Sequence, residues 1–341
     1  MDTILFLAHT EADGSLAKAS LEALAAAQTV AEGLGAGLAV GLYGAETAGA
    51  FATVAGCGAT AFFGVTGETF GVSRYATDAA ALEGLAKAAG ATILVAADDS
   101  RISRALPGVA ARLGGRIDAH VTGLAATDGK VVATRGFYRQ RLQAELTRPE
   151  RPWCLTVAGG CFAAYAGAPG QPAVTAVTVP VPAALTRTTV KTVIAPSADE
   201  QTIRPDAKLL FVAGAGWTKK QSDGATHAPE AGDIILGFLG KSKASLGSSK
   251  SLVDMGGEGE AVLPFLTHLH QVGQTGATPR HPKGLATCCH GEEPHVVGWR
   301  FIGERRAVNL DAACGWAQGK ADVLYVADAF AVMRKINELL A

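Results

Sequence analysis

The chain has 341 residues, which is more than one ordinary hydrophobic core holds and about right for two domains. Its formal net charge is −1, and its lysines and arginines form no basic stripe, which argues against nucleic acid as a partner. No apolar run approaches the roughly 20 residues that a membrane-spanning helix needs, and no basic region precedes the first apolar stretch. We therefore expect a cytoplasmic protein with no direct membrane insertion.

The first half of the sequence alternates between short apolar runs and Ala/Leu-rich segments with helical spacing. The apolar runs predict strands, at residues 4–8, 38–43, 61–65 and 92–96. The other segments predict helices, one capped by Ser15 and others near residues 48–55, 76–89 and 101–113. Asp98-Asp99 follows the fourth strand and is expected to cap the next helix. This alternation predicts a parallel sheet with helices on both faces.

After Arg116 the pattern changes to consecutive strands. These are predicted at residues 121–124, 130–134, 141–146 and 154–157, with Asp128-Gly129 as a hairpin turn between the first two. We expect the first domain, residues 1–190, to end in this mostly antiparallel run. A polar linker is predicted at residues 191–206.

A second domain is predicted at residues 207–341. Its first strand, 208–213, leads into the turn Gly214-Ala215-Gly216-Trp217, at the strand end where ligands bind in open α/β sheets. Further strands are predicted at residues 285–289, 307–310 and 323–326, with helices near residues 232–239 and 328–340. The predicted class is α/β: an amino-terminal parallel-sheet domain with added antiparallel strands, followed by a second doubly wound domain.

Other motifs in the second domain are incomplete. The turn at Gly214 begins like a dinucleotide fingerprint, but Lys219 stands in place of its third glycine. The histidines and cysteines from His268 to His295 match no familiar zinc spacing, so we expect no metal site. An NAD-linked enzyme stays open as an alternative to the function below.

A compact polar loop, Gln271-Val272-Gly273-Gln274-Thr275-Gly276, stands late in the chain. Its two glycines, three residues apart, let the backbone turn sharply and approach a ligand. Its amide and hydroxyl groups can hydrogen-bond to a flat polar molecule. We interpret this loop as a candidate flavin site.

From residue 208 onward the chain resembles the alpha subunit of electron-transfer flavoproteins, with the loop 271–276 as that family has it. Ser249-Lys250 stands where the family has a serine-arginine pair, and Asn309-Leu310-Asp311 matches its Asn-x-Asp. His290-Gly291-Glu292-Glu293-Pro294-His295 stands where the family has a serine-glycine turn leading to a histidine. Val326-Ala327-Asp328 matches the start of its last helix, and the first domain agrees more loosely.

The resemblance implies that the second domain binds FAD. The implied cofactor-binding residues are Ser249, Lys250, Gln271, Val272, Gly273, Gln274, Thr275, Gly276, His290, Gly291, His295, Asn309 and Asp328. Among them, Lys250 would stand beside the flavin ring, where a cation favours the anionic reduced form. Thr275 and His295 would also face the ring, while Asn309 and Asp328 would bind the adenosine end.

The implied function is that of an electron carrier rather than a substrate-converting enzyme. FAD would take electrons from a partner flavoprotein dehydrogenase and pass them to an acceptor such as a quinone oxidoreductase. The family works as a heterodimer, so a beta subunit is expected, which carries AMP in many members. Lysine at position 250 keeps the charge but not the planar guanidinium. An alternative is therefore a structural or regulatory subunit of a dehydrogenase complex with a degraded flavin site.

Overall fold

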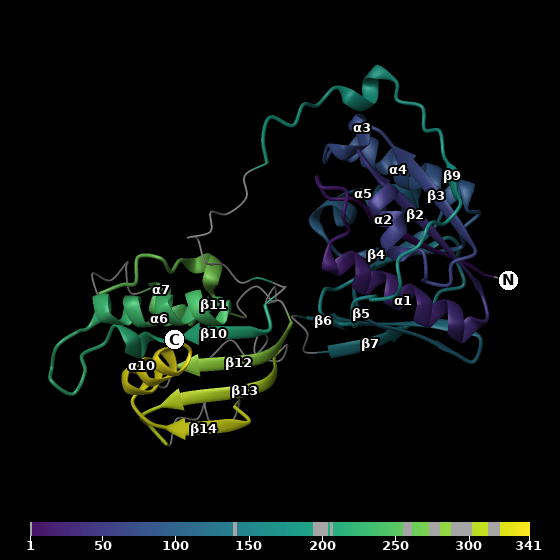
Figure 1. Ribbon diagram of the computed structural model, residues 1–341. Coiled ribbons are helices and arrows are strands. Elements are labelled where there is room, and N and C mark those ends of the chain that lie inside the picture. The colour runs from purple at the N-terminus through teal and green to yellow at the C-terminus, as the bar shows by residue number, and fades with distance from the viewer. Residues whose placement is uncertain are drawn as a thin grey trace. The chain divides into compact units, whose positions relative to one another are not determined.

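The computed structural model describes residues 2–138, 142–193, 204, 207–254, 261–272, 280–287, 302–312 and 321–341. They form two compact units, Met1–Val193 and Ile194–Ala341, each built around its own sheet (Figure 1). Most of the predicted linker, residues 191–206, lies outside the described residues. Among the helices described, none combines the length and apolar character that a bilayer crossing requires.

The described part of the first unit forms a nine-stranded sheet in the order β7-β6-β5-β8-β4-β1-β2-β3-β9. Its strands are β1 (Thr3–His9), β2 (Gly37–Gly44), β3 (Ala61–Thr66), β4 (Ile93–Ala97), β5 (Arg116–Thr127), β6 (Lys130–Phe137), β7 (Leu142–Leu146), β8 (Trp153–Val157) and β9 (Val174–Ala176). Its helices are α1 (Lys18–Leu34), α2 (Ala48–Val54), α3 (Glu68–Gly71), α4 (Tyr75–Ala88) and α5 (Ser100–Arg112), with a 3-10 turn η1 (Ala183–Thr186).

Helices cover both faces of this sheet, as predicted. Ile4 and Phe6 of β1 belong to one buried apolar cluster, together with residues of α1 and α2. Leu5 and Leu7 point to the opposite face and belong to a second cluster with residues of α4 and α5. A strand that is buried on both faces consists of an unbroken run of apolar residues, and β1 could therefore be predicted from the sequence.

Two local expectations for the first unit are wrong. Ser15 does not cap the first helix, because α1 begins at Lys18 and the Ser15 hydroxyl donates to Asp13 instead. The strand β8 is not part of an antiparallel run: it lies between β4 and β5 and is parallel to both. All five residues of β8 are buried, the pattern of a central parallel strand. The antiparallel pairing of β5 with β6, through the Asp128-Gly129 turn, is confirmed.

Asp118 of β5 is a buried carboxylate that connects β5 with β8 and the chain before β8. The indole nitrogen of Trp153 donates to it at 2.9 Å, and the Arg148 guanidinium forms an ion pair with it. Burial by itself would raise the pKa of Asp118, but the hydrogen bonds from Arg148 and Trp153 outweigh it and lower the pKa below its ordinary value.

Replacing Asp118 with asparagine should lower the stability of the first unit at neutral pH by about 1–3 kcal/mol, a usual range for hydrogen bonds to a charged group. Because the folded pKa is depressed, the carboxylate stabilises fully above its unfolded pKa of about 3.9. Its contribution disappears as the pH falls through the lower folded pKa. Urea unfolding should therefore show that the difference in free energy of unfolding between wild type and variant becomes smaller below about pH 4. A difference that does not change with pH would contradict this.

The described part of the second unit forms a five-stranded sheet in the order β11-β10-β12-β13-β14, whose neighbouring strands are all parallel. Its strands are β10 (Leu209–Ala213), β11 (Ser245–Ser248), β12 (His281–Thr287), β13 (Ile302–Asn309) and β14 (Val323–Val326). Its described helices are α6 (Ala228–Ser242), α7 (Lys250–Asp254) and α10 (Ala329–Leu339), with 3-10 turns η2 (Ala215–Trp217) and η4 (His268–His270).

The helices α6 and α10 pack side by side on one face of this sheet, where Phe211 and Met333 join one apolar cluster (Figure 1). The chain proceeds from β10 to β11 on one side and returns to place β12 on the other side of β10. The connection therefore reverses direction between β10 and β12, which makes this the switch point where open α/β sheets bind ligands. The strand β11 was not predicted, because its sequence, Ser-Leu-Gly-Ser, has a single large apolar residue.

Candidate functional site

The predicted site residues that the structure describes lie at the carboxyl edge of the second sheet, the edge where its parallel strands end. Ser249 and Lys250 follow β11, Asn309 ends β13, and Asp328 precedes α10 just after β14. Gln271 forms an isolated parallel bridge with Ser248, the last residue of β11. The other predicted site residues, Gly273, Gln274, Thr275, Gly276, His290, Gly291 and His295, lie outside the described residues.

Ser248, Ser249, Lys250, Gln271 and Val272 form the β11 corner of this edge. The amide of Val272 donates to the carbonyl of Ser248 at 3.0 Å, and the amide of Ser249 donates to the carbonyl of Ala213 at 2.8 Å. Gly247 makes the approach of Val272 possible, because a Cβ at position 247 would lie 2.5 Å from Cγ2 of Val272. The start of the predicted flavin loop is therefore packed directly against β11.

Two polar groups of the β11 corner lack partners among the described residues. The Ser248 hydroxyl and the Gln271 side-chain amide nitrogen are both buried and form no hydrogen bond there. Ser248 is fully buried and Gln271 is 9% exposed. Buried polar groups are nearly always hydrogen-bonded, because leaving one unsatisfied costs about 1–3 kcal/mol. These two groups lie on adjacent backbones, so a single molecule with hydrogen-bonding atoms can satisfy both.

Lys250 does not stand alone at this corner. Its ammonium group forms an ion pair with the carboxylate of Asp254, one helical turn further along α7. Nε2 of His268 lies 2.8 Å from the other oxygen of the same carboxylate. Hydrogen bonds from Lys250 and then His268 lower the pKa of Asp254. Asp254 stands four residues after Lys250, which is the i,i+4 spacing of a helical ion pair.

The glycine turn after β10 is filled by Trp217. The indole is fully buried, its nitrogen donates to the Thr287 hydroxyl at 2.8 Å, and its ring centroid lies 4.6 Å from that of Phe330. The amide of Gly214 is also used, donating to the carbonyl of Thr287 at 2.8 Å. This turn therefore joins the ends of β10 and β12, and Gly214 does not present the open phosphate-binding amide that an NAD-linked enzyme would use.

Asn309 and Asp328 come together at the other end of the carboxyl edge. The amide of Ala327 donates to the carbonyl of Asn309 at 3.1 Å, and Asp328 caps α10 by accepting from the amide of Ala331 at 3.0 Å. Both residues line a small concavity that also includes Gln221 and Phe330. This end of the edge therefore places an amide and a carboxylate side chain beside an aromatic ring, and Oδ1 of Asn309 also accepts from the amide of Asp311 at 3.3 Å.

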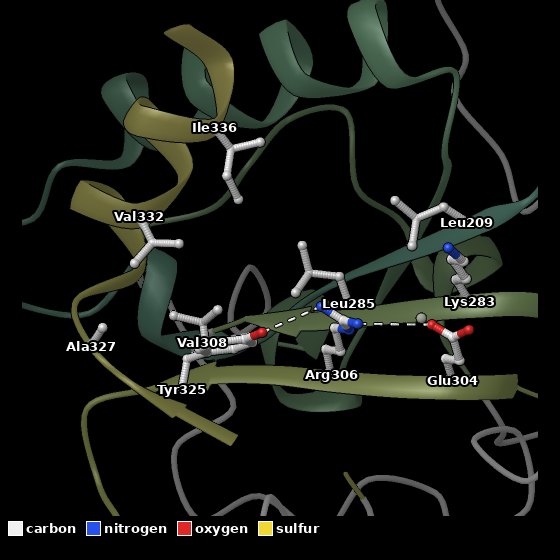
Figure 2. A pocket seen from close by; sticks show the side chains of 11 residues that line it. Leu209, Lys283, Leu285, Glu304, Arg306, Val308, Tyr325, Ala327, Val332 and Ile336 are labelled. Carbon is white, nitrogen blue, oxygen red and sulfur yellow. Dashed lines mark hydrogen bonds and ion pairs between the residues drawn. The ribbon is translucent and has the colours of Figure 1, made fainter. Parts of the chain in front are cut away.

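A larger cavity, of about 500 Å³, lies on the face of the sheet beside α10 and contains none of the predicted site residues. Figure 2 shows Leu285 and Val308 on its floor and Val332 and Ile336 of α10 above them. At its rim, the Arg306 guanidinium contacts the Tyr325 hydroxyl at 3.3 Å and the Glu304 carboxylate at 3.9 Å. We place the candidate site at the carboxyl edge, where topology, unsatisfied polar groups and predicted residues coincide.

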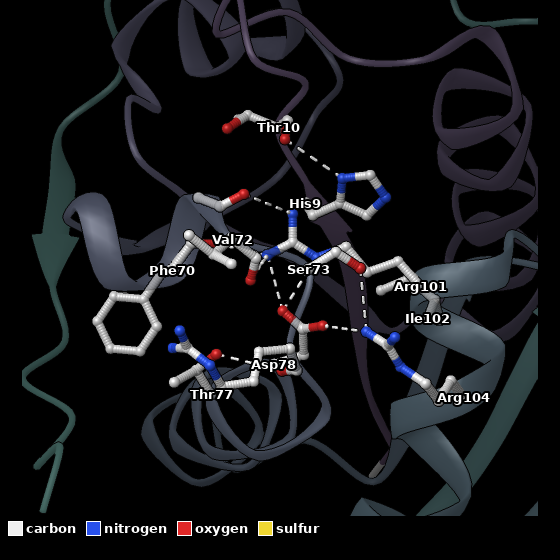
Figure 3. Close-up of polar contacts among 12 residues, drawn as sticks. His9, Thr10, Phe70, Val72, Ser73, Thr77, Asp78, Arg101, Ile102 and Arg104 are labelled. Atoms are coloured by element: carbon white, nitrogen blue, oxygen red, sulfur yellow. Dashed lines mark hydrogen bonds and ion pairs between the residues drawn. The ribbon is translucent and has the colours of Figure 1, made fainter. Parts of the chain in front are cut away.

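The first unit contains a buried ionic cluster, shown in Figure 3. Asp78 of α4 is fully buried and accepts from Arg101 of α5 at 2.7 and 2.9 Å, while Arg104 donates to its other oxygen at 3.0 Å. Arg101 also donates to the backbone carbonyls of residues 70–72. Asp99 accepts from the amides of Arg101 and Ile102, which confirms the predicted capping role. Because its groups bind one another, we interpret this cluster as structural.

A metal site finds no support in the part of the chain that the structure describes. There, no group of three or more histidine, cysteine, aspartate or glutamate residues could hold a metal ion. His281, one of the histidines considered above, is buried in β12 and lies 3.0 Å from the Ser245 hydroxyl and 2.9 Å from the carbonyl of Arg204. This histidine joins the end of the predicted linker to the second sheet.

A family model described as the electron transfer flavoprotein domain matches residues 4–183. The matched segment is more than half of the chain and nearly all of the first unit, whereas the candidate site lies in the second. A comparison with curated proteins gave no match. The chain therefore belongs to the electron transfer flavoprotein domain family, which is associated with flavins.

Proposed function

We propose that this chain is the alpha subunit of an electron-transfer flavoprotein and that its second unit binds FAD at the carboxyl edge. The observation that supports this most strongly is the pair of unsatisfied groups, the Ser248 hydroxyl and the Gln271 amide. They lie where the predicted flavin loop meets β11, beside the switch point of the sheet. The donors and acceptors present fit the polar atoms of a flavin dinucleotide.

The size of the carboxyl edge also fits an elongated cofactor. Three strand-to-strand steps separate β11 from β13. Neighbouring strands lie about 4.8 Å apart, so roughly 14 Å separate the β11 corner from Asn309. A dinucleotide can span such a distance, with its flavin end at the β11 corner and its adenosine end near Asn309 and Asp328.

In this proposal the protein binds and tunes the cofactor, while FAD, when bound, supplies reversible electron uptake and release. Ser248 and Gln271 would hydrogen-bond to it, and Lys250 would supply positive charge near the ring. A beta subunit of the same family would complete the site and could carry AMP. A flavoprotein dehydrogenase would be the electron donor, and a quinone oxidoreductase is the acceptor class we propose.

The test of this function is the absorption spectrum of the full chain co-expressed with its partner subunit. Flavin bands, with about one FAD released per heterodimer on denaturation, would support the proposal; this stoichiometry is the one-site expectation. A colourless, stable complex that takes up no added FAD would overturn it. That result would favour the alternative of a structural or regulatory subunit with a degraded site.

Replacing Lys250 with alanine should lower the midpoint potential of the bound flavin, because a nearby positive charge stabilises the anionic reduced form. Redox titration of the reconstituted complex measures this shift. Lys241→Ala is a matched control: it removes the same charge from the last turn of α6, at the opposite edge of the sheet, where Lys241 bonds the carbonyl of Asn337. An unchanged potential in the Lys250 variant would remove the proposed role.

A further inference from the structure

The carboxylate of Asp254 connects two segments that each carry a proposed flavin contact. One of its oxygens pairs with Lys250, at the start of α7. The other lies 2.8 Å from Nε2 of His268, at the start of η4 and 14 residues further along the chain. Asp254 therefore holds α7 and η4 together through one charged group.

The turn η4 leads directly into Gln271. Thr267 begins it with a capping box, in which its hydroxyl accepts from the amide of Leu269 and the ring of His270 bonds back to the amide of Thr267. The next residue, Gln271, bridges to Ser248. The chain from Ser248 through Asp254 to Gln271 is thus closed at two points, by this bridge and by the Asp254–His268 contact. Gln271 itself forms the first closure and lies three residues after His268, which forms the second.

We propose that Asp254 is a positioning residue of the flavin site, which orients Lys250 and holds the segment bearing Gln271 against β11. This inference rests on the proposed function, because it assigns Asp254 a role in FAD binding and in the flavin potential. Asp254 also carries a negative charge next to the positive charge of Lys250. The field that reaches the flavin should therefore come from the pair and not from Lys250 alone.

The Asp254→Asn variant tests both parts of the proposal in the full chain with its partner subunit. Loosening of the Gln271 segment should weaken FAD binding by roughly fivefold to tenfold, the usual effect of about one hydrogen bond. Loss of the negative charge should move the potential upward, opposite to the shift expected for Lys250→Ala. The double variant Asp254→Asn with Lys250→Ala should lie between the two, because the charges removed have opposite signs. An ion pair too far from the flavin to influence it would not produce these opposed shifts.

Asp322→Asn is the matched control, because Asp322 is a similarly exposed carboxylate that pairs with Arg305 at 2.7 Å, just before β14 at the opposite edge. Neither FAD affinity nor potential should change in it. His268→Gln should reproduce the loss of affinity without the upward shift. If wild type binds FAD and Asp254→Asn matches it in affinity and potential, the role of Asp254 is overturned while the proposed function stands. If wild type binds no FAD, the proposed function itself fails.

Discussion

Replacing Arg101 with methionine should lower the free energy of unfolding of the first unit by about 3–5 kcal/mol, the usual result of removing one partner from a buried ion pair. The substitution leaves the fully buried Asp78 carboxylate with only the partly exposed Arg104 as its ionic partner. It also removes the donors that the carbonyls of residues 70–72 accept from. The junction of α3, α4 and α5 should therefore open first.

Amide hydrogen exchange of β1 and β4 measures this loss, because both strands lie in the middle of the sheet and exchange through opening of the whole unit. Their protection should fall by roughly a hundredfold or more, since each 1.4 kcal/mol corresponds to a factor of ten. Arg104→Met is the control: its side chain is 44% exposed, and such pairs contribute at most about 1 kcal/mol. Equal losses in the two variants would contradict the assignment of Arg101 as the principal partner.

Replacing Gly247 with alanine should weaken FAD binding by about tenfold to a hundredfold. The added methyl group would stand 2.5 Å from Cγ2 of Val272, closer than carbon atoms can approach. Overpacking of this kind costs about 1–3 kcal/mol, and the neighbour on a loop can move more easily than β11, which is paired along its length with β10. We expect Val272 and Gln271 to be displaced from Ser248, which separates the two groups proposed to bind FAD.

A compensating substitution makes this prediction specific. Val272→Ala removes the methyl group that the new Cβ would meet, so the double variant Gly247→Ala with Val272→Ala should recover most of the lost affinity. Quenching of flavin fluorescence on binding measures the dissociation constants of wild type and both variants. If the double variant binds FAD no better than Gly247→Ala, the displacement of the loop is not the cause of the weakening.

The architecture of both units could be predicted because their buried strands are continuous apolar runs separated by helical periodicity. β1, β4 and β10 are all of this kind, and so is β8, although its direction could not be read from the sequence. The direction in which a strand pairs depends on where it inserts in the sheet. β8 inserts between β4 and β5, whereas the strands that precede and follow it in the chain, β7 and β9, lie at the two edges of the sheet. The short strand β11 escaped prediction because small polar residues carry no periodic signal.

The position of Asn309 at the carboxyl edge was predictable because it ends an apolar strand, and parallel strands bring their carboxyl ends to one edge. Ser249 was named through the family resemblance alone, because the strand that it follows, β11, was not predicted. The role of Trp217 could not be predicted, because the sequence does not show that its indole, and not a ligand, fills the glycine turn after β10. Nor could the Asp254–His268 contact be predicted, since 14 residues separate the partners. Contacts across a loop depend on how that loop closes, which has no local sequence signature.

The buried indole of Trp217 also gives the second unit its own optical probe. The first unit has an equivalent in Trp153, which is fully buried in β8 and hydrogen-bonded to Asp118. The chain has four tryptophans, and the other two are Trp299 and Trp316. Replacing these two with phenylalanine, together with either Trp153 or Trp217, would leave one emitting indole in one chosen unit. The melting of each unit could then be followed separately by its fluorescence within the same intact chain.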